Sequence, residues 1–311
     1  MVESDALDAY TAQTKEWLNT RFRKTTADGI FFAHQNIYGF KSPYCEDGVV
    51  LRYVIFSNVI KALKKLRFES FLDVGGAEGY MSAVIRDLFH VNVHSCDLSD
   101  EACARARELF QVDADPVDGV ALPYADNSID VVLSSESLEH IPQYEGVLKE
   151  LLRVARKAVV ITVPHDGPEA VADNIRRQVP HGHIHDFTLA SFRDLVPKEY
   201  GVKAWGLFSS ILRLPFRLIE GRPVELETRT GLKRLLVRAL NPFITVAGKM
   251  MNRTAFKTLL AIDPFLSNSL NTYRQLLFII AKDPSCFTED SAPQADVDSI
   301  LNFKVPLYKL K

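Results

Sequence analysis

Three closely spaced glycines are the first residues whose type and spacing could do chemistry. Gly75, Gly76 and Gly79 follow a short apolar run that contains Asp73. The apolar run predicts a strand, and the residues after the glycines predict a helix. A strand that turns into a helix on glycines exposes backbone N–H groups and the positive end of the helix dipole. The stretch therefore predicts a ligand-binding turn.

Two kinds of ligand use such a turn, dinucleotides and S-adenosylmethionine. The dinucleotide pattern is Gly-x-Gly-x-x-Gly, followed by an acidic residue about 20 positions on. Here the order is Asp73-x-Gly75-Gly76-Ala77-x-Gly79, with an acid ahead of the glycines. Asp97 ends the next predicted strand, and a carboxylate there can accept two hydrogen bonds from the vicinal hydroxyls of a ribose. For Asp97 alone, a helix cap is the alternative.

Histidines supply the second chemistry, because their pKa suits general base catalysis near neutral pH. His140 follows the fourth predicted strand, His165 follows the fifth, and three more lie in His181-Gly-His183-Ile-His185-Asp186. In an extended backbone those three share one face, and with Asp186 they could ligate zinc or iron. The simpler interpretation is that these histidines are structural and bond to the backbone without binding metal.

Composition excludes several classes of protein. The chain has 311 residues, enough for an α/β core with additional segments, and a net charge of −2, which argues against a general nucleic-acid binder. The four cysteines are scattered without Cys-x-x-Cys spacing, which favours a reducing compartment such as the cytoplasm and gives no zinc framework. We expect no signal peptide, and no apolar run approaches the roughly 20 residues of a membrane span.

The elements that must position these residues alternate between strand and helix. We predict strands at 68–74, 91–96, 114–117, 129–133, 158–163, 202–208 and 275–281. We predict helices at 6–24, 51–66, 80–90, 100–110, 144–154 and 188–195. This alternation is typical of a doubly wound, Rossmann-like α/β sheet that is covered on both faces.

Two segments lie outside this alternation. The aromatic passage at 30–40 predicts either a hydrophobic plug under the first helix or a cap over a cleft, with His34, Gln35 and Tyr38 facing inward. The segment 211–260 holds ten Lys/Arg against three Glu and predicts helices at 231–240 and 245–260, separated by Pro242. Its cationic and apolar faces favour either a membrane-surface helix or a packed helical subdomain with a basic rim.

Together these motifs resemble the class I S-adenosylmethionine-dependent methyltransferases, in the small-molecule group called type 11. The glycine stretch resembles the family's first motif, with Ala77 in place of its central glycine. The stretch from Asp118 to Asp130, Asp-Gly-Val-Ala-Leu-Pro-Tyr-Ala-Asp-Asn-Ser-Ile-Asp, resembles Asp-Ala-x-x-Leu-Pro-Phe-x-Asp-x-Ser-Phe-Asp, and Leu138-Glu139-His140 resembles a Leu-Glu-His segment after the fourth strand. The resemblance covers about residues 68–208 and the last strand.

The resemblance implies S-adenosyl-L-methionine as the cofactor and a seven-stranded sheet whose last strand is antiparallel. Asp97 would take the ribose hydroxyls, Asp118 the adenine amino group, and Asp73 would orient the loop or accept from the amino group of the methionine part. The implied cofactor contacts are Asp73, Gly75, Gly76, Gly79, Asp97, Leu98, Asp118, Gly119 and Glu136. The candidate catalytic residues on the acceptor side are His140, His185 and His183, with no metal.

We therefore expect a methyltransferase domain at 68–210 plus 273–284, a helical and aromatic N-terminal cap at 1–67, a basic helical insertion at 211–272 and a C-terminal tail at 285–311. The expected reaction is methyl transfer to a small or lipid-linked acceptor, most readily at oxygen, with peripheral membrane contact through 211–260. A non-catalytic scaffold with the same fold is the alternative, followed by a nicotinamide-dependent oxidoreductase.

Overall fold

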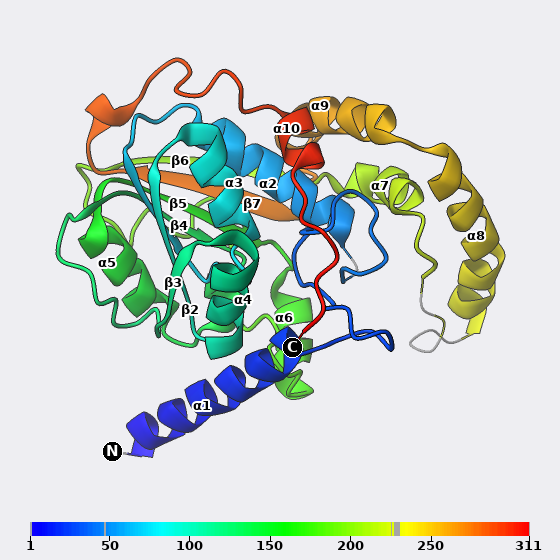
Figure 1. Cartoon of the computed structure of the whole chain (residues 1–311), viewed down its shortest axis with the longest axis horizontal. Helices are drawn as coiled ribbons and strands as arrows, with labels where there is room; N and C mark the ends of the chain where they lie inside the picture. The colour runs from blue at the N-terminus through cyan, green and yellow to red at the C-terminus, as the bar shows by residue number, and fades with distance from the viewer. Residues whose placement is uncertain (1, 47, 225, 227–230, 311) are drawn as a thin grey trace.

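The computed structural model describes residues 2–46, 48–224, 226 and 231–310, and within them seven strands form one sheet in the order β3-β2-β1-β4-β5-β7-β6 (Figure 1). The strands are β1 (Ser70–Val74), β2 (Asn92–Asp97), β3 (Asp113–Pro116), β4 (Ile129–Ser135), β5 (Ala155–Pro164), β6 (Gly201–Leu207) and β7 (Gln275–Ala281). The pairs among β1 to β5 are parallel, whereas β7 runs antiparallel to both β5 and β6. The predicted Rossmann-like sheet with an antiparallel last strand is confirmed. Residues 1, 47, 225, 227–230 and 311, which fall in the expected cap, insertion and tail, lie outside the described residues.

Helices cover both faces of this sheet, and the described residues also form helices beyond it. They are α1 (Val2–Phe22), α2 (Val49–Leu63), α3 (Tyr80–Phe89), α4 (Asp100–Phe110), α5 (Tyr144–Val154), α6 (Pro168–Arg176), α7 (Arg213–Glu220), α8 (Gly231–Met250), α9 (Arg253–Ser269) and α10 (Val297–Asn302). Alternate residues of a strand point to opposite faces, so Phe71 packs in the core that contains α2 and α3, while Leu72 packs in the core that contains α5. Both faces of β1 are thus buried, as is typical of a central strand in a parallel sheet.

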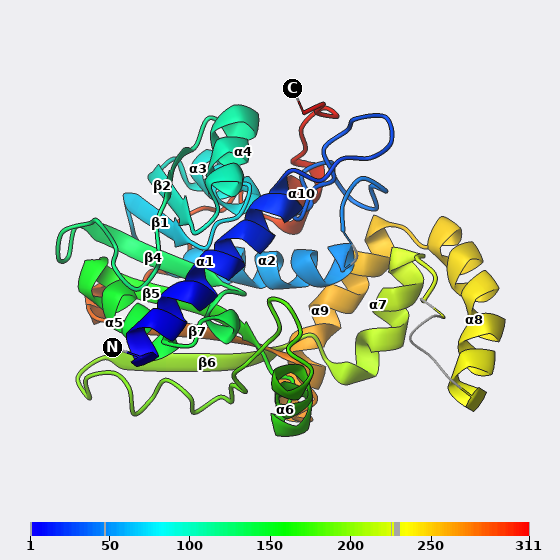
Figure 2. The same cartoon turned by 90° about the horizontal axis from the view of Figure 1, so that it is seen from below.

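Helix α1 crosses the molecule on the side of the glycine turn, which Figure 2 shows from below. It is held to the start of α4 by an ion pair between Lys15 and Asp100, with 2.9 Å between Nζ and Oδ2. The Ser99 hydroxyl donates to Asn19 of α1 and also accepts from the N–H of Ala102, so Ser99 is the N-cap of α4. The N-terminal helix therefore closes over the edge of the sheet where ligands bind in α/β folds.

The helix predicted at 188–195 is wrong. Residues 188–195 form successive turns whose hydrogen bonds span three residues, such as Ser191 N–H to Thr188 O and Leu195 N–H to Phe192 O. Pro197 follows closely and disfavours helical backbone in the residue before it. Phe192 is fully buried against the sheet, which fixes the segment in its turns.

The predicted break at Pro242 is also wrong, because α8 continues through it to Met250. A proline inside a helix leaves the carbonyl four residues earlier without its donor. That carbonyl belongs to Arg238, which is exposed, so water can donate to it instead. Helices α6, α7 and α10 were not predicted. Gly167-Pro168 is nevertheless a recognisable start for α6, with Gly167 at a φ of 85° and Pro168 in the first turn.

Candidate functional site

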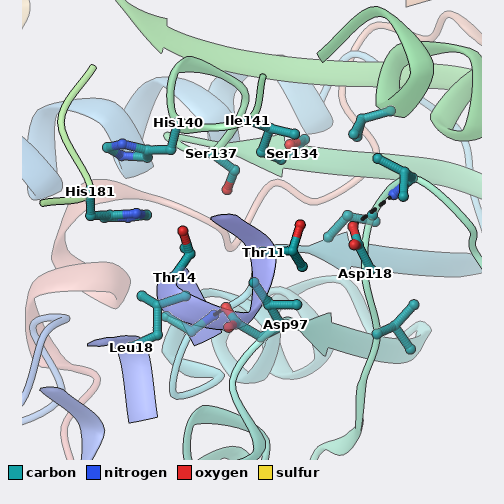
Figure 3. A pocket seen from close by; sticks show the side chains of 18 of the residues that line it. Thr11, Thr14, Leu18, Asp97, Asp118, Ser134, Ser137, His140, Ile141 and His181 are labelled. Carbon is teal, nitrogen blue, oxygen red and sulfur yellow. Dashed lines mark hydrogen bonds between the residues drawn. The ribbon is translucent and has the colours of Figure 1, made fainter. Parts of the chain in front are cut away.

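A cavity of about 200 Å³ lies where β1, β2 and β4 end and α1 crosses over them (Figure 3). It is lined by the glycine turn, by the ends of β2 and β4, by the loop after β3 and by α1. Of the predicted cofactor residues, it contains Gly75, Asp97, Leu98, Asp118, Gly119 and Glu136. Three residues that are far apart in the sequence, Gly75, Asp97 and Asp118, therefore meet in one pocket.

Gly75 is the glycine of the turn that the cavity requires. Its φ is +81°, a left-handed conformation that residues with a Cβ rarely adopt. A Cβ at this position would lie 2.2 Å from the Ser137 hydroxyl oxygen, which lines the same cavity. Its N–H donates to Cys96 O at 2.8 Å, so the turn is tied to the end of β2. Both the backbone and the cavity shape select glycine here.

The other two glycines serve packing and do not line this cavity. A Cβ on Gly76 would lie 2.1 Å from the Ser95 hydroxyl oxygen on β2. Gly79 has a φ of +79°, and a Cβ there would lie 2.7 Å from Ala106 Cβ on α4. Gly79 thus permits α3 to begin against α4. These packing contacts account for glycine at both positions, and their predicted approach to the cofactor stays a prediction.

Ala77, which replaces the family's central glycine, has a φ of 50°. The backbone at Ala77 is therefore left-handed, a conformation that residues with a Cβ seldom adopt. The Ala77 N–H donates to Asp97 Oδ2 at 3.0 Å, which holds the turn in this conformation. A left-handed residue with a Cβ costs roughly 1–2 kcal/mol. The turn is therefore strained, and its hydrogen bond to Asp97 stabilises it.

Asp97 both shapes the turn and faces the cavity (Figure 3). Its other oxygen, Oδ1, accepts from the N–H of Ser99 at 2.9 Å. Burial raises the pKa of this carboxyl, and the hydrogen bonds from the backbone of Ser99 and Ala77 oppose that effect. Each oxygen retains a second lone pair, so the group can still accept from a ligand diol.

Asp73 lies beneath the turn and is not part of the cavity lining. It is 2% exposed, and its Oδ2 accepts from the Ser82 hydroxyl on α3 at 2.7 Å. Burial raises the pKa of Asp73 to about 6. Of the two roles that the resemblance implies, orienting the loop fits this position, whereas contact with the methionine part of a cofactor does not.

Asp118 and Gly119 form the wall opposite the glycine turn. Asp118 Oδ1 accepts from the N–H of Val120 at 3.2 Å, which fixes the carboxylate at the cavity (Figure 3). The following Leu122 is 5% exposed and is held from α5, because its N–H donates to Glu150 and its carbonyl accepts from Arg153. The family-specific Leu-Pro-Tyr turn thus anchors the loop that carries Asp118.

Helix α1 contributes cavity residues that the sequence did not identify. They recur at helical spacing on one face and are Tyr10, Thr11, Thr14, Leu18, Arg21 and Phe22. Their spacing was visible, but nothing local to the helix indicated that this face would cover a cavity. His34 also lines the cavity, as the cap interpretation of the aromatic passage predicted. The Tyr38 hydroxyl instead donates to Phe31 O inside the core, as the plug interpretation predicted.

Among the predicted catalytic histidines, only His140 lines the cavity, and it stacks on His181 with 3.6 Å between ring centroids (Figure 3). Burial, followed by the neighbouring His181 and His183, lowers the pKa of His140 well below its usual value. His183 lies behind it and pairs with Asp166, and His185 Nε2 contacts Ile141 O at 2.9 Å. His165 contacts Phe187 O at 2.7 Å and lies outside the lining.

Two buried glutamates stand beside these histidines. Glu136 lines the cavity, and burial raises its pKa to about 7. Burial, reinforced by Glu136, raises the pKa of Glu139 well above its usual value. Glu136 Oε1 and Glu139 Oε2 are both buried without a hydrogen-bond partner among the described residues. Leaving a buried carboxylate oxygen without a partner costs free energy. A bound ligand, or a proton on each carboxylate, would lower that cost.

Residues 72–163 match the family model of the methyltransferase domain. An uncharacterized methyltransferase of Mycobacteroides abscessus is 36% identical over 99 residues, which are 29% of this chain and 37% of that protein. The 2-methyl-6-phytyl-1,4-hydroquinone methyltransferase of a Synechocystis strain is 35% identical over 100 residues, 30% of each chain. The matched part of the chain spans about a third of the length of these curated relatives.

Two further similarities are more distant. The phosphoethanolamine N-methyltransferase 2 of Caenorhabditis elegans is 28% identical over 119 residues, which are 36% of this chain and 27% of that protein. Among solved structures, the geranyl diphosphate C-methyltransferase of Streptomyces coelicolor A3(2) aligns with a TM-score of 0.49 and 13% identity, over 88% of this chain and 98% of that one.

Proposed function

The chain carries a class I S-adenosylmethionine-dependent methyltransferase domain, and from this premise we propose that it transfers the methyl group of S-adenosyl-L-methionine to an oxygen of a small or lipid-linked acceptor. The observation that supports this most is the meeting of Gly75, Asp97 and Asp118 in one cavity. In this proposal Asp97 accepts from the ribose hydroxyls, and Asp118 accepts from the adenine amino group. The turn at Gly75 leaves room for the methionine part.

The bound cofactor supplies a methyl group on a sulfonium centre, and the protein's main task is alignment. In-line displacement is accelerated chiefly by holding the nucleophile close and correctly oriented. We assign that task on the acceptor side to His140, which lines the cavity, and to Ser137 and Glu136 beside it. Helix α1 excludes water from above, and the Tyr10 hydroxyl donates to His140 O at 3.0 Å. His183 and His185 lie behind this wall and support it through their contacts with Asp166 and with Ile141 O.

The preference for an amphiphilic acceptor rests on α8. The most exposed apolar residues of this helix, Leu232, Leu235, Leu236, Phe243, Val246 and Met250, are 56–78% exposed and recur at helical spacing on one face. Lys233 and Arg238 flank this stripe, and Arg234 lies on the opposite face of the helix. Figures 1 and 2 show α8 projecting from the end of the molecule, away from the sheet. No described helix combines the length and apolarity needed to cross a bilayer.

Helices that lie in a membrane surface typically have a long exposed apolar stripe with cationic residues beside it. We propose that α8 holds the protein on an anionic membrane and so brings the cavity to an acceptor with a lipid part. One of the relatives reported above is named for a phytyl hydroquinone, an acceptor of this amphiphilic class.

Calorimetric titration with S-adenosylmethionine tests the cofactor site. Gly75→Val places a side chain against Ser137 and forces a strained φ, so we expect at least a hundredfold loss of affinity with the circular dichroism spectrum unchanged. Gly146→Ala on α5 is the matched control, since its new Cβ would come no closer than 4.0 Å to any neighbouring atom, and it should bind as the wild type does. Retained affinity in Gly75→Val would contradict the site.

The same titration, together with a transfer assay and a titration with NADH, separates the alternative functions. Cofactor binding without transfer from labelled S-adenosylmethionine to any fraction of a lipid extract supports the non-catalytic scaffold. Binding of NADH in place of S-adenosylmethionine would support an oxidoreductase and refute the methyl transfer that we propose.

A further inference from the structure

Behind the cavity wall, three side chains from two separate segments direct potential metal ligands at one point. They are Glu139 and His140, at the turn after β4, and His183, from the loop after α6. One ligand atom from each lies within 4.8 Å of the other two, and Glu139 Oε1 is 3.7 Å from His140 Nε2. Two imidazoles and one carboxylate are a donor set that divalent transition metals such as zinc and iron(II) prefer.

The hydrogen bonds of both histidines leave the same nitrogen available. His140 Nδ1 is 3.3 Å from Gly182 O, and a carbonyl can only accept, so Nδ1 carries the proton and Nε2 has the lone pair. His183 Nδ1 pairs with the Asp166 carboxylate, which likewise places the proton on Nδ1. Protein metal sites commonly hold their histidines in this way, through a carbonyl or a carboxylate on the far nitrogen. Asp166 therefore has the position of an orienting carboxylate behind a ligand.

The glutamate of this cluster has a buried carboxylate oxygen that accepts no hydrogen bond from the described residues. Glu139 is 1% exposed, and its Oε2 has no hydrogen-bond partner among the described residues. The nearby Glu136 Oε1 is in the same condition. Burying a carboxylate oxygen without a hydrogen-bond partner is costly, and a divalent cation bound to Glu139 would remove that cost.

The sequence suggested a metal site in a different arrangement, along His181, His183, His185 and Asp186. The structure separates these residues, because His185 Nε2 contacts Ile141 O and Asp186 Oδ1 accepts from the N–H of Gly167. Only His183 of that run joins the cluster, and its partners come from the segment after β4. A single-segment pattern could not predict this.

We propose that Glu139, His140 and His183 bind one divalent transition-metal ion at the acceptor side of the cavity, with Asp166 orienting His183. His140 belongs to both the cavity lining and the cluster, so the ion would sit against the acceptor wall. With the ion bound, His140 Nε2 is a ligand, and its role on the acceptor side becomes that of holding the ion. Binding of the ion does not depend on the proposed methyl transfer, and the two can fail separately.

The test is calorimetric titration of chelator-treated, full-length protein with zinc chloride and, separately, iron(II) under anaerobic conditions, with magnesium chloride as the hard-cation comparison. We expect one zinc or iron(II) per chain and no saturable magnesium binding. His183→Ala and Glu139→Gln should lose the binding. Asp166→Asn should retain the stoichiometry with an affinity about 10–100-fold lower.

His94→Gln is the control, because His94 is an exposed histidine on β2 that has no part in the cluster. It should bind zinc as the wild type does, and circular dichroism should show that every variant is folded. The proposal is overturned if the wild type binds no transition metal with one-to-one stoichiometry, or if His94→Gln lowers the affinity as much as His183→Ala does. Titration with S-adenosylmethionine in the presence of chelator reports on the cofactor site independently.

Discussion

Single residues in the turn after β1 combine structural and ligand-binding roles that their sequence motif does not distinguish. Gly75 and Asp97 face the cavity, whereas Asp73, Gly76 and Gly79 support the turn from beneath. The difference is one of surroundings, because Asp73 is buried against Ser82 of α3, and Gly76 and Gly79 lie against Ser95 of β2 and Ala106 of α4. Substitutions at the two kinds of position should therefore affect different measurements.

Asp73 should make stability depend on pH. Burial raises its pKa from 3.8 to about 6 in the folded protein, so the folded state holds the proton more tightly than the unfolded state does. The stabilisation from the protonated group is complete below pH 4 and is lost as the pH rises through 6. The free energy of unfolding should fall by up to about 3 kcal/mol over that window on account of this group.

Urea denaturation at a series of pH values checks this expectation. Asp73→Asn keeps an acceptor for Ser82 and should remove that part of the pH dependence, whereas Asp113→Asn, at an exposed position on β3, should retain it. Identical slopes in Asp73→Asn and the wild type would show that Asp73 is not the titrating group.

At the level of elements, the site depends on contacts that set helices against one another and against the sheet. The start of α3 touches α4 through Gly79 and Ala106, and α1 is tied to α4 through Asn19 and Ser99. These contacts decide where the turn and its roof lie. The helices are thus part of the site although few of their residues line it.

Gly79→Ala should lower the free energy of unfolding, because Gly79 packs against α4 and does not line the cavity. The added methyl would lie 2.7 Å from Ala106 Cβ and 3.1 Å from its Cα, and the φ of +79° is strained for alanine. We expect the free energy of unfolding to fall by about 2–3 kcal/mol. Denaturation of Gly79→Ala beside Gly146→Ala, which should not be destabilised, provides the measurement. Equal stability of the two variants would refute the packing role.

At the scale of the whole molecule, the cavity and α8 lie on different parts of the fold. Helix α8 joins the rest of the protein mainly through its second half, where Gly248 packs against Gly221 of α7 and Lys41 donates to Gly248 O at 2.7 Å. The apolar residues of its first half face solvent. This arrangement suits a helix that contacts a surface while the sheet holds the reaction site.

Vesicle co-sedimentation tests that contact. Leu235 and Leu236 are 66% and 60% exposed, and replacing both by serine should weaken binding to phosphatidylglycerol-containing vesicles by at least tenfold, since each buried leucine contributes about 2 kcal/mol. Ile175→Ser, at an equally exposed isoleucine on α6, should bind as the wild type does. Equal partitioning of all three proteins, or no preference for the anionic vesicles, would contradict the membrane role of α8.

The sequence by itself determined the positions of the seven strands and the glycine turn, while the antiparallel last strand and the pairing of Asp97 with Asp118 came from the resemblance to a known family. It could do so because apolar periodicity and glycine spacing are local consequences of backbone geometry. It could not predict the turns at 188–195 or the continuation of α8 through Pro242, since solvent access and packing against the sheet override local propensity there.

Tertiary structure alone decided that one face of α1 would roof the cavity, that Gly79 would serve α4, and that Glu139 and His140 would meet His183. Each of these depends on contacts between segments that are more than 20 residues apart. Spacing along the chain carries no information about such meetings, because they are set by how the helices and loops pack on the finished sheet.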